Sequence, residues 1–265
     1  MKNYLIILFV FFTTAVCTAQ DWPLKTKVLE KKAKQLAFVP VSAFSFSKDQ
    51  LLTGRGTYQE LNADLNALQT VNRERPEALQ FSIPVSNRES IVCELIKTDL
   101  GNALFTKDGN QAVTNVIPPV CYRGIVAGEK QKNNVLLTIN QGYFAFTATF
   151  DDKVIQLSQI DDLEKSTFRL YNSKILEFPV FPLECGTNKE PSAQAKAAMY
   201  NASISPMAPQ DKCVYVFVEC FDSLYQWRNK SIQETIDYVY ALYNNVATGY
   251  LNEQINIKIS TINVW

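Results

Sequence analysis

Short runs of alternating apolar and polar residues begin at Leu79 and continue for about eighty residues along the chain. Glycine, asparagine and aspartate separate these runs, as in antiparallel β-sheets joined by tight turns. The pairs Asp151-Asp152 and Asp161-Asp162 follow the same pattern, and we interpret them as turns. The alternation predicts six strands, at 79–85, 90–96, 122–126, 134–139, 143–150 and 153–159.

The pattern changes near residue 212 from alternating runs to longer apolar segments. Val214 to Val218 is continuously apolar, which predicts a strand buried on both faces. Ser231 and Glu234 have the spacing of a capping box, so a helix is expected to start at Ser231, and its apolar stripe extends to about Leu251. Isoleucine-rich sequence follows and predicts a closing strand. The predicted order of strand, helix and strand is that of an α/β sheet.

Two regions carry weaker patterns. Residues 21–75 are polar and mixed, with one short helix expected around 59–68. Residues 186–211 hold three prolines with several serines and alanines, which is typical of a linker. The predicted fold class is α+β, in which a β-rich antiparallel domain at 20–185, with its core from about residue 79, precedes a strand-helix-strand unit at 212–265.

The N-terminus has the form of a secretory signal peptide. Lys2 precedes an apolar stretch from Tyr4 to Val16, and small residues end at Ala19, after which we expect cleavage. The apolar stretch is shorter than the roughly 20 residues that cross a bilayer, so we expect an exported protein without a stable membrane span. Lysine plus arginine and aspartate plus glutamate each number 26, and this balance argues against a nucleic-acid partner.

The numbers of cysteines and histidines limit which disulfides, catalytic groups and zinc sites this chain can form. Five cysteines remain after signal removal, so at least one thiol lacks a disulfide partner within the chain. Cys213 and Cys220 flank one predicted strand and lie too far apart to bridge each other. The sequence contains no histidine, which excludes Ser-His-Asp triads, Cys-His pairs and zinc sites built on imidazole.

Two stretches, taken together, resemble the reprolysin-type (adamalysin-like) metzincin zinc metalloendopeptidases of bacterial secreted type. Cys121 to Gly128, followed by 134–139 and Gly142, is similar to the aromatic-x-Gly strand, second strand and glycine turn of the family's propeptide. Residues 213–265 are similar to the opening of the catalytic domain, with a strand ending near Asp222, a long helix and a closing N-I-x-I-x-x-x-x-x-W strand.

The resemblance implies a zymogen. It makes 20–185 a propeptide, and Cys185-Gly186 is similar to the family's cysteine switch, in which a thiolate occupies the fourth position of the catalytic zinc. Cys185 is thus a candidate metal ligand, although half of a disulfide or an inert thiol remains open. The H-E-x-x-H motif has no counterpart here, so we expect this chain alone to be inactive and to hold no zinc. Its expected partners are the remainder of the catalytic domain and the parent's peptide or protein substrate.

Two further hypotheses remain open. An exported β-rich binding or adhesion module without enzymatic activity would explain the missing histidines. A stand-alone protease inhibitor derived from a propeptide would be soluble with Cys185 accessible.

Overall fold

The structure is a computed structural model. It describes residues 22–46, 52–53, 56–86, 88–109, 111–150, 153–159, 166–174 and 213–265. The predicted signal peptide at 1–19, the aspartate pairs at 151–152 and 161–162, Cys185 and the predicted linker at 186–211 lie outside the described residues.

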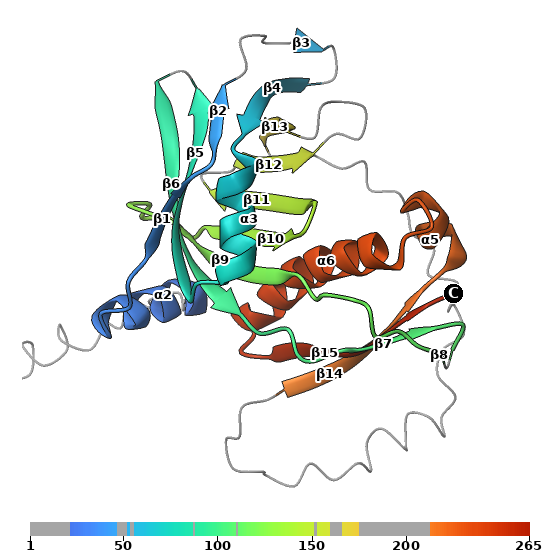
Figure 1. The fold of residues 1–265 in the computed structure, drawn as a ribbon. Coiled ribbons are helices and arrows are strands. Elements are labelled where there is room, and N and C mark those ends of the chain that lie inside the picture. The colour runs from blue at the N-terminus through green and yellow to red at the C-terminus, as the bar shows by residue number, and fades with distance from the viewer. Residues whose placement is uncertain are drawn as a thin grey trace, which may run out of the picture.

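Within the described residues, eleven strands form one large sheet that curls into a nearly closed barrel (Figure 1). The two ends of the sheet, β1 and β2, are consecutive in the chain and are separated only by Ala43. The closure leaves little free strand edge. The strands are β1 (Val39–Ser42), β2 (Phe44–Phe46), β3 (Leu52–Thr53), β4 (Gly56–Ala63), β5 (Ala78–Ser86), β6 (Glu89–Thr98), β9 (Val120–Val126), β10 (Asn134–Asn140), β11 (Tyr143–Phe150), β12 (Lys153–Gln159) and β13 (Thr167–Lys174).

The inside of the barrel is filled by aliphatic and aromatic side chains. Phe44 packs edge-on against Phe144 and Phe168, with ring centroids 5.3 Å apart in both pairs. Helix α3 (Leu65–Glu74) adds Leu68 and Val71 to the same core. Alternate residues of each strand reach this core, so the alternation in the sequence marks the inner face.

Gly124 marks a close approach of two strands. It lies in β9 opposite Leu95 of β6, and a Cβ atom at this position would meet the backbone oxygen of Glu94 at 1.8 Å. Only glycine fits here, which explains physically the glycine of the aromatic-x-Gly strand.

A second, four-stranded sheet has the order β14-β15-β7-β8. β14 (Cys213–Cys220) runs parallel to β15 (Asn256–Val264), and helices α5 (Asp222–Trp227) and α6 (Ile232–Asn252) connect them. β7 (Leu104–Lys107) and β8 (Gln111–Ala112) complete this sheet from the region predicted as propeptide. The strand-helix-strand unit therefore shares its sheet with residues that lie more than a hundred positions earlier in the chain.

Helix α6 packs between the two sheets (Figure 1). One side of the helix contacts β15, and another contacts β9, β10 and β11 of the barrel. Helix α2 (Pro23–Ala33) packs beside it on the outside of the barrel, where Leu24 and Val28 meet Ile125 and Leu251.

All six predicted strands are present, with ends shifted by up to two residues. The predicted cap at Ser231 is confirmed, because its hydroxyl accepts a hydrogen bond from the Glu234 amide at the start of α6. The reciprocal half of the capping box is absent, since the Ser231 amide donates to the Arg228 oxygen and the Glu234 carboxylate accepts from Asn229. The coarse α+β, strand-rich class holds, although the barrel core begins well before residue 79 and one strand pair, β1 with β5, is parallel.

Two predictions were wrong. The helix expected at 59–68 starts only at Leu65, where the Asp64 carboxylate caps it, because the preceding residues form β4 against β13. Val214 to Val218 is not buried on both faces, because α6 covers one face of the small sheet, where Val216 and Val218 pack, and Tyr215 and Phe217 on the other face are exposed.

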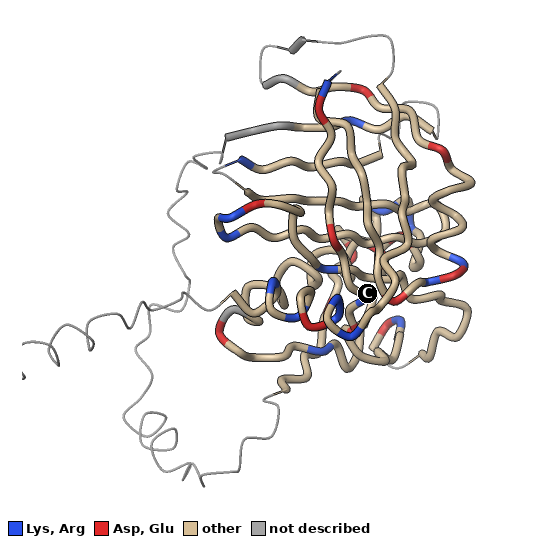
Figure 2. Tube along the Cα trace, turned by 90° about the vertical axis from the view of Figure 1, so that its left-hand side faces the viewer, with Lys and Arg blue, Asp and Glu red and all other residues tan. Residues whose placement is uncertain are grey.

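Charges of both signs are interspersed along the described trace (Figure 2). Among the described residues, no helix is long and apolar enough to span a membrane.

Candidate functional site

The four described cysteines are free thiols. Burial raises the pKa of Cys93 and of Cys121 to about 12, and that of Cys220 to about 11. These thiols stay protonated near neutral pH and are poor metal ligands, since only the thiolate binds a metal. Cys213 and Cys220 sit at opposite ends of β14, as the spacing predicted. Cys185, the predicted zinc ligand, and Gly186 beside it lie outside the described residues.

The described residues do not bring together the side chains that usually bind zinc. They contain no group of three or more His, Cys, Asp or Glu side chains arranged to hold a metal ion, and the sequence has no histidine.

The junction between α6 and the barrel is polar. The outer face of β9 and β10 carries Cys121, Arg123, Thr138 and Asn140, while most apolar residues of these strands belong to the barrel core. Helix α6 places Asp237, Asn244 and Thr248 against this face, because residues seven and eleven positions apart share one side of a helix. All seven residues are at most 6% exposed.

Asn244 is the centre of this junction and is fully buried. Its side-chain oxygen accepts from Arg123 Nε at 2.8 Å, and its nitrogen donates to the backbone oxygens of Tyr122 and Leu137, each at 3.2 Å. One side chain thus fixes the helix against two neighbouring strands.

Asp237 anchors the N-terminal half of the same helix. Its Oδ1 accepts from Asn140 Nδ2 at 2.8 Å and from Gln233 Nε2 at 2.9 Å. Burial raises the pKa of Asp237 to about 6, although the hydrogen bonds from Asn140 and Gln233 partly oppose this shift. A carboxyl whose pKa is raised by burial makes the stability of this junction fall as the pH rises from about 4 to about 6.

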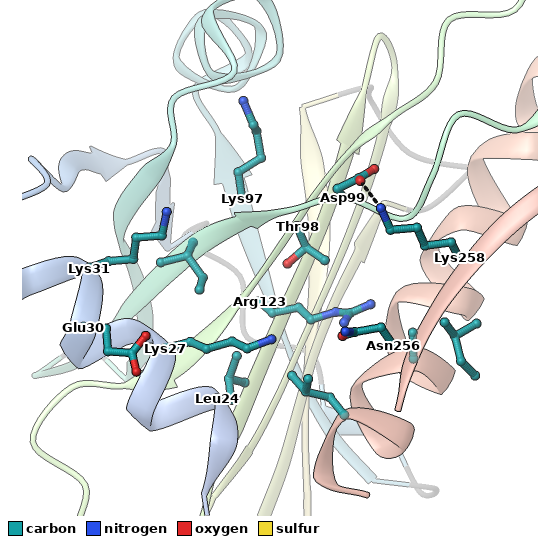
Figure 3. A pocket seen from close by; sticks show the side chains of 14 residues that line it. Leu24, Lys27, Glu30, Lys31, Lys97, Thr98, Asp99, Arg123, Asn256 and Lys258 are labelled. Carbon is teal, nitrogen blue, oxygen red and sulfur yellow. Dashed lines mark hydrogen bonds and ion pairs between the residues drawn. The ribbon is translucent and has the colours of Figure 1, made fainter. Parts of the chain in front are cut away.

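A cavity of about 370 Å³ opens beside this junction, between α2, β6, β9, α6 and β15. Figure 3 shows Arg123 in its middle, with Lys27 approaching from α2 and Asn256 and Lys258 from the small sheet. The charged side chains that line it are five cations (Lys27, Lys31, Lys97, Arg123 and Lys258) and two acids (Glu30 and Asp99). The cavity is therefore basic, although the chain as a whole is neutral.

The free edge of the small sheet is apolar. Within the described residues β14 pairs only with β15, and Val214, Tyr215 and Phe217 are 47 to 66% exposed. Helix α6 exposes Leu242, Val246 and Tyr250 at four-residue spacing. At about 100° per residue, this stripe lies roughly opposite the side that carries Asp237 and Asn244. These six residues are called the apolar rim below.

Sequence reasoning missed the groups that line the cavity. The lysine-rich piece at the N-terminus carried a helix signal, since Pro23 suits the first helical turn and Leu24 and Val28 are four residues apart. Arg123 gave a weaker signal, as a charged residue in an otherwise apolar strand. No local pattern shows that α2 and β15 meet around it.

No protein-family model matches this sequence. No curated protein is similar enough to it to count as a match. The relation to metzincins therefore stays a prediction from the residues quoted above.

Proposed function

We propose that this chain is the N-terminal part of an exported zinc metalloendopeptidase zymogen. Residues 20–185 act as its propeptide, Cys185 acts as the inhibitory zinc ligand, and residues 212–265 open the catalytic domain. Proteolysis belongs to the longer protein, and zinc with its other ligands comes from the part that follows Trp265.

The observation that carries this proposal is the apolar rim. A terminal strand that exposes valine, tyrosine and phenylalanine is an open template for another strand. An exposed apolar stripe on the adjoining helix is likewise a surface that another segment covers. Both lie on the strand-helix-strand unit that resembles the start of a catalytic domain, where the rest of that domain would pack.

The polar junction supports an interaction between propeptide and catalytic segment. Arg123, Thr138 and Asn140 come from the segment proposed as propeptide, and they bind α6 of the segment proposed as catalytic. β7 adds a backbone interaction, since it pairs with β15. A propeptide that contributes a strand and a hydrogen-bonding face can act as a folding template as well as an inhibitor.

The test uses the protein encoded by the whole reading frame that contains this chain. Wild type, Cys185→Ala and Cys213→Ala are compared for bound zinc and for peptidase activity before propeptide removal. We expect zinc in all three, activity in Cys185→Ala alone, and wild-type behaviour in Cys213→Ala, whose half-buried thiol serves as the control. A reading frame that stops at Trp265, a longer protein without zinc, or an inactive Cys185→Ala variant that binds zinc would each refute the proposal.

An exported binding or adhesion module is the second candidate. The observation in its favour is the exposure of Tyr215, Phe217, Phe221 and Trp227, since aromatic side chains are enriched where proteins recognise partners. This candidate predicts that the reading frame contains no zinc motif and that the aromatic side chains remain exposed in the whole protein.

A further inference from the structure

The guanidinium of Arg123 carries an unbalanced charge in a buried place. Its Nε donates to the neutral side chain of Asn244, and its Nη2 is buried without a hydrogen-bond partner among the described residues. The residue is only 6% exposed. Burial lowers the pKa of Arg123 to about 10, so the group is still protonated at neutral pH. An unpaired buried charge is costly, and proteins keep such groups where a partner of opposite charge binds.

The carboxylates around the cavity, apart from Glu30, pair with lysines rather than with Arg123. Asp99 pairs with Lys258 at 2.7 Å, Glu77 pairs with Lys97, and Glu94 pairs with Lys32. No ion pair to Arg123 is found within the described part of the chain. Arg123 therefore lines the cavity without a neutralising carboxylate partner (Figure 3).

Two lysines from α2 add positive charge at the same place. Lys27 and Lys31 are one helical turn apart and both line the cavity, because the burial of Leu24 and Val28 fixes how the helix is turned. Glu30 is the only acid on the lining of α2, and neither lysine has an ion-pair partner in the described residues. Figure 3 shows the Lys27 ammonium extending toward Arg123.

We infer that this cavity is a binding site for a small oxyanion, a phosphate or carboxylate group. The Arg123 guanidinium and the Lys27 ammonium supply charge-assisted donors, and the Thr98 hydroxyl, which also lines the cavity, supplies a neutral one. A volume of about 370 Å³ suits a small molecule rather than a polymer. This site does not depend on the proposed protease role.

The position of the site gives the anion a structural consequence. Lys27 and Arg123 come from the α2 and barrel side, whereas Asn256 and Lys258 belong to the small sheet. A bound anion would neutralise repulsion across this boundary and so hold the two parts together. Binding should therefore raise the melting temperature of the chain, since a ligand of the folded state stabilises that state.

The test titrates the purified chain with inorganic phosphate and, separately, with succinate, and measures binding by calorimetry and the melting temperature by scanning fluorimetry. Sodium chloride at matched ionic strength is the reference. We expect saturable binding of at least one of the two anions together with a rise in melting temperature above that in chloride. Phosphate alone or succinate alone would identify which chemistry the site selects.

Single-charge variants localise the binding. Lys27→Gln should weaken the affinity about tenfold, and Arg123→Gln should abolish binding. The control Lys25→Gln removes one charge from the same helix, outside the cavity, and should keep the affinity within about twofold of wild type. Because Lys27 is not part of a core, its variant remains informative even if Arg123→Gln fails to fold. Equal shifts with chloride, or wild-type affinity in Lys27→Gln, would overturn the inference.

Discussion

The two sheets of this chain differ in how completely their strand edges are paired and their apolar side chains are buried. The large sheet brings its first and last strands together at Ala43 and fills its interior with phenylalanine and aliphatic side chains. The small sheet ends on β14, whose exposed residues include Tyr215 and Phe217. Closure removes free edges from the first sheet, whereas the second retains one that is apolar. We infer that the barrel is closed by its own strands, whereas the β14 edge of the small sheet is open to pairing within the described residues.

The contrast is tested most strongly by matched phenylalanine truncations. Phe81→Ala removes a fully buried ring from the barrel and should lower the free energy of unfolding by roughly 3 to 5 kcal/mol. Phe217→Ala removes a 57% exposed ring and should change it by less than about 0.5 kcal/mol. Urea unfolding followed by circular dichroism measures both. Equal losses would contradict the difference between a packed core and an open rim.

Glycine substitutions test the close approach of β9, which also contacts α6, to the neighbouring strand β6. Gly124→Ala puts a methyl group 1.8 Å from the Glu94 oxygen and should cost roughly 3 kcal/mol. Gly249→Ala is the control, since a Cβ there meets nothing within 4 Å and alanine favours a helix by up to about 1 kcal/mol. Thermal unfolding compares the two variants. A tolerated Gly124→Ala would mean that β6 and β9 are farther apart than described.

The junction itself is tested at Asn244. Asn244→Ala leaves Arg123 Nε and the oxygens of Tyr122 and Leu137 without their partner, and should cost about 2 kcal/mol. Asn245→Ala changes the exposed neighbour and should cost less than about 0.5 kcal/mol. Chemical denaturation of both variants measures the difference. Similar values for the two would show that the polar junction does not fix α6.

An effect similar in size to that of Asn244→Ala is expected from the pH dependence of Asp237. Its pKa is raised to about 6 in the folded state from an ordinary value of 3.8, so the folded state binds the proton more tightly than the unfolded state. Stability should therefore fall as pH rises from about 4 to about 6, by on the order of 2 kcal/mol. Asp237→Asn should remove this decline, because the asparagine does not titrate. Its amide oxygen can still accept the hydrogen bonds from Asn140 and Gln233. A wild-type decline that persists in the variant would contradict the role of Asp237.

Much of the barrel was predictable from sequence because its central strands alternate between an apolar inside and a more polar outside. The capping box at Ser231 likewise located α6. β4 was missed because a helix-like stretch pairs with β13, and only Asp64 at the true cap signalled the real start. The burial of β14 was mispredicted because the apolar run does not reveal whether helices cover one face of its sheet or both.

The candidate site was the least predictable part. The cavity is lined by three distant segments of the chain, which contribute Lys27, Arg123 and Lys258. They come together because α2 packs on the barrel and β15 pairs with β7. Such contacts depend on non-local pairing that single-sequence periodicity does not record. Cys185 has the opposite character, since it was selected by a local motif alone.

The proposed zymogen predicts, as its central claim, that the edge of β14 receives another strand in the protein from the complete reading frame. Hydrogen–deuterium exchange of this chain and of the protein from the complete reading frame measures it directly. In this chain about half of the β14 amides, those that point away from β15, should exchange rapidly. We predict strong protection of these same amides in the longer protein, with the amides bonded to β15 unchanged. Equally rapid exchange of the outer β14 amides in both proteins would contradict the account.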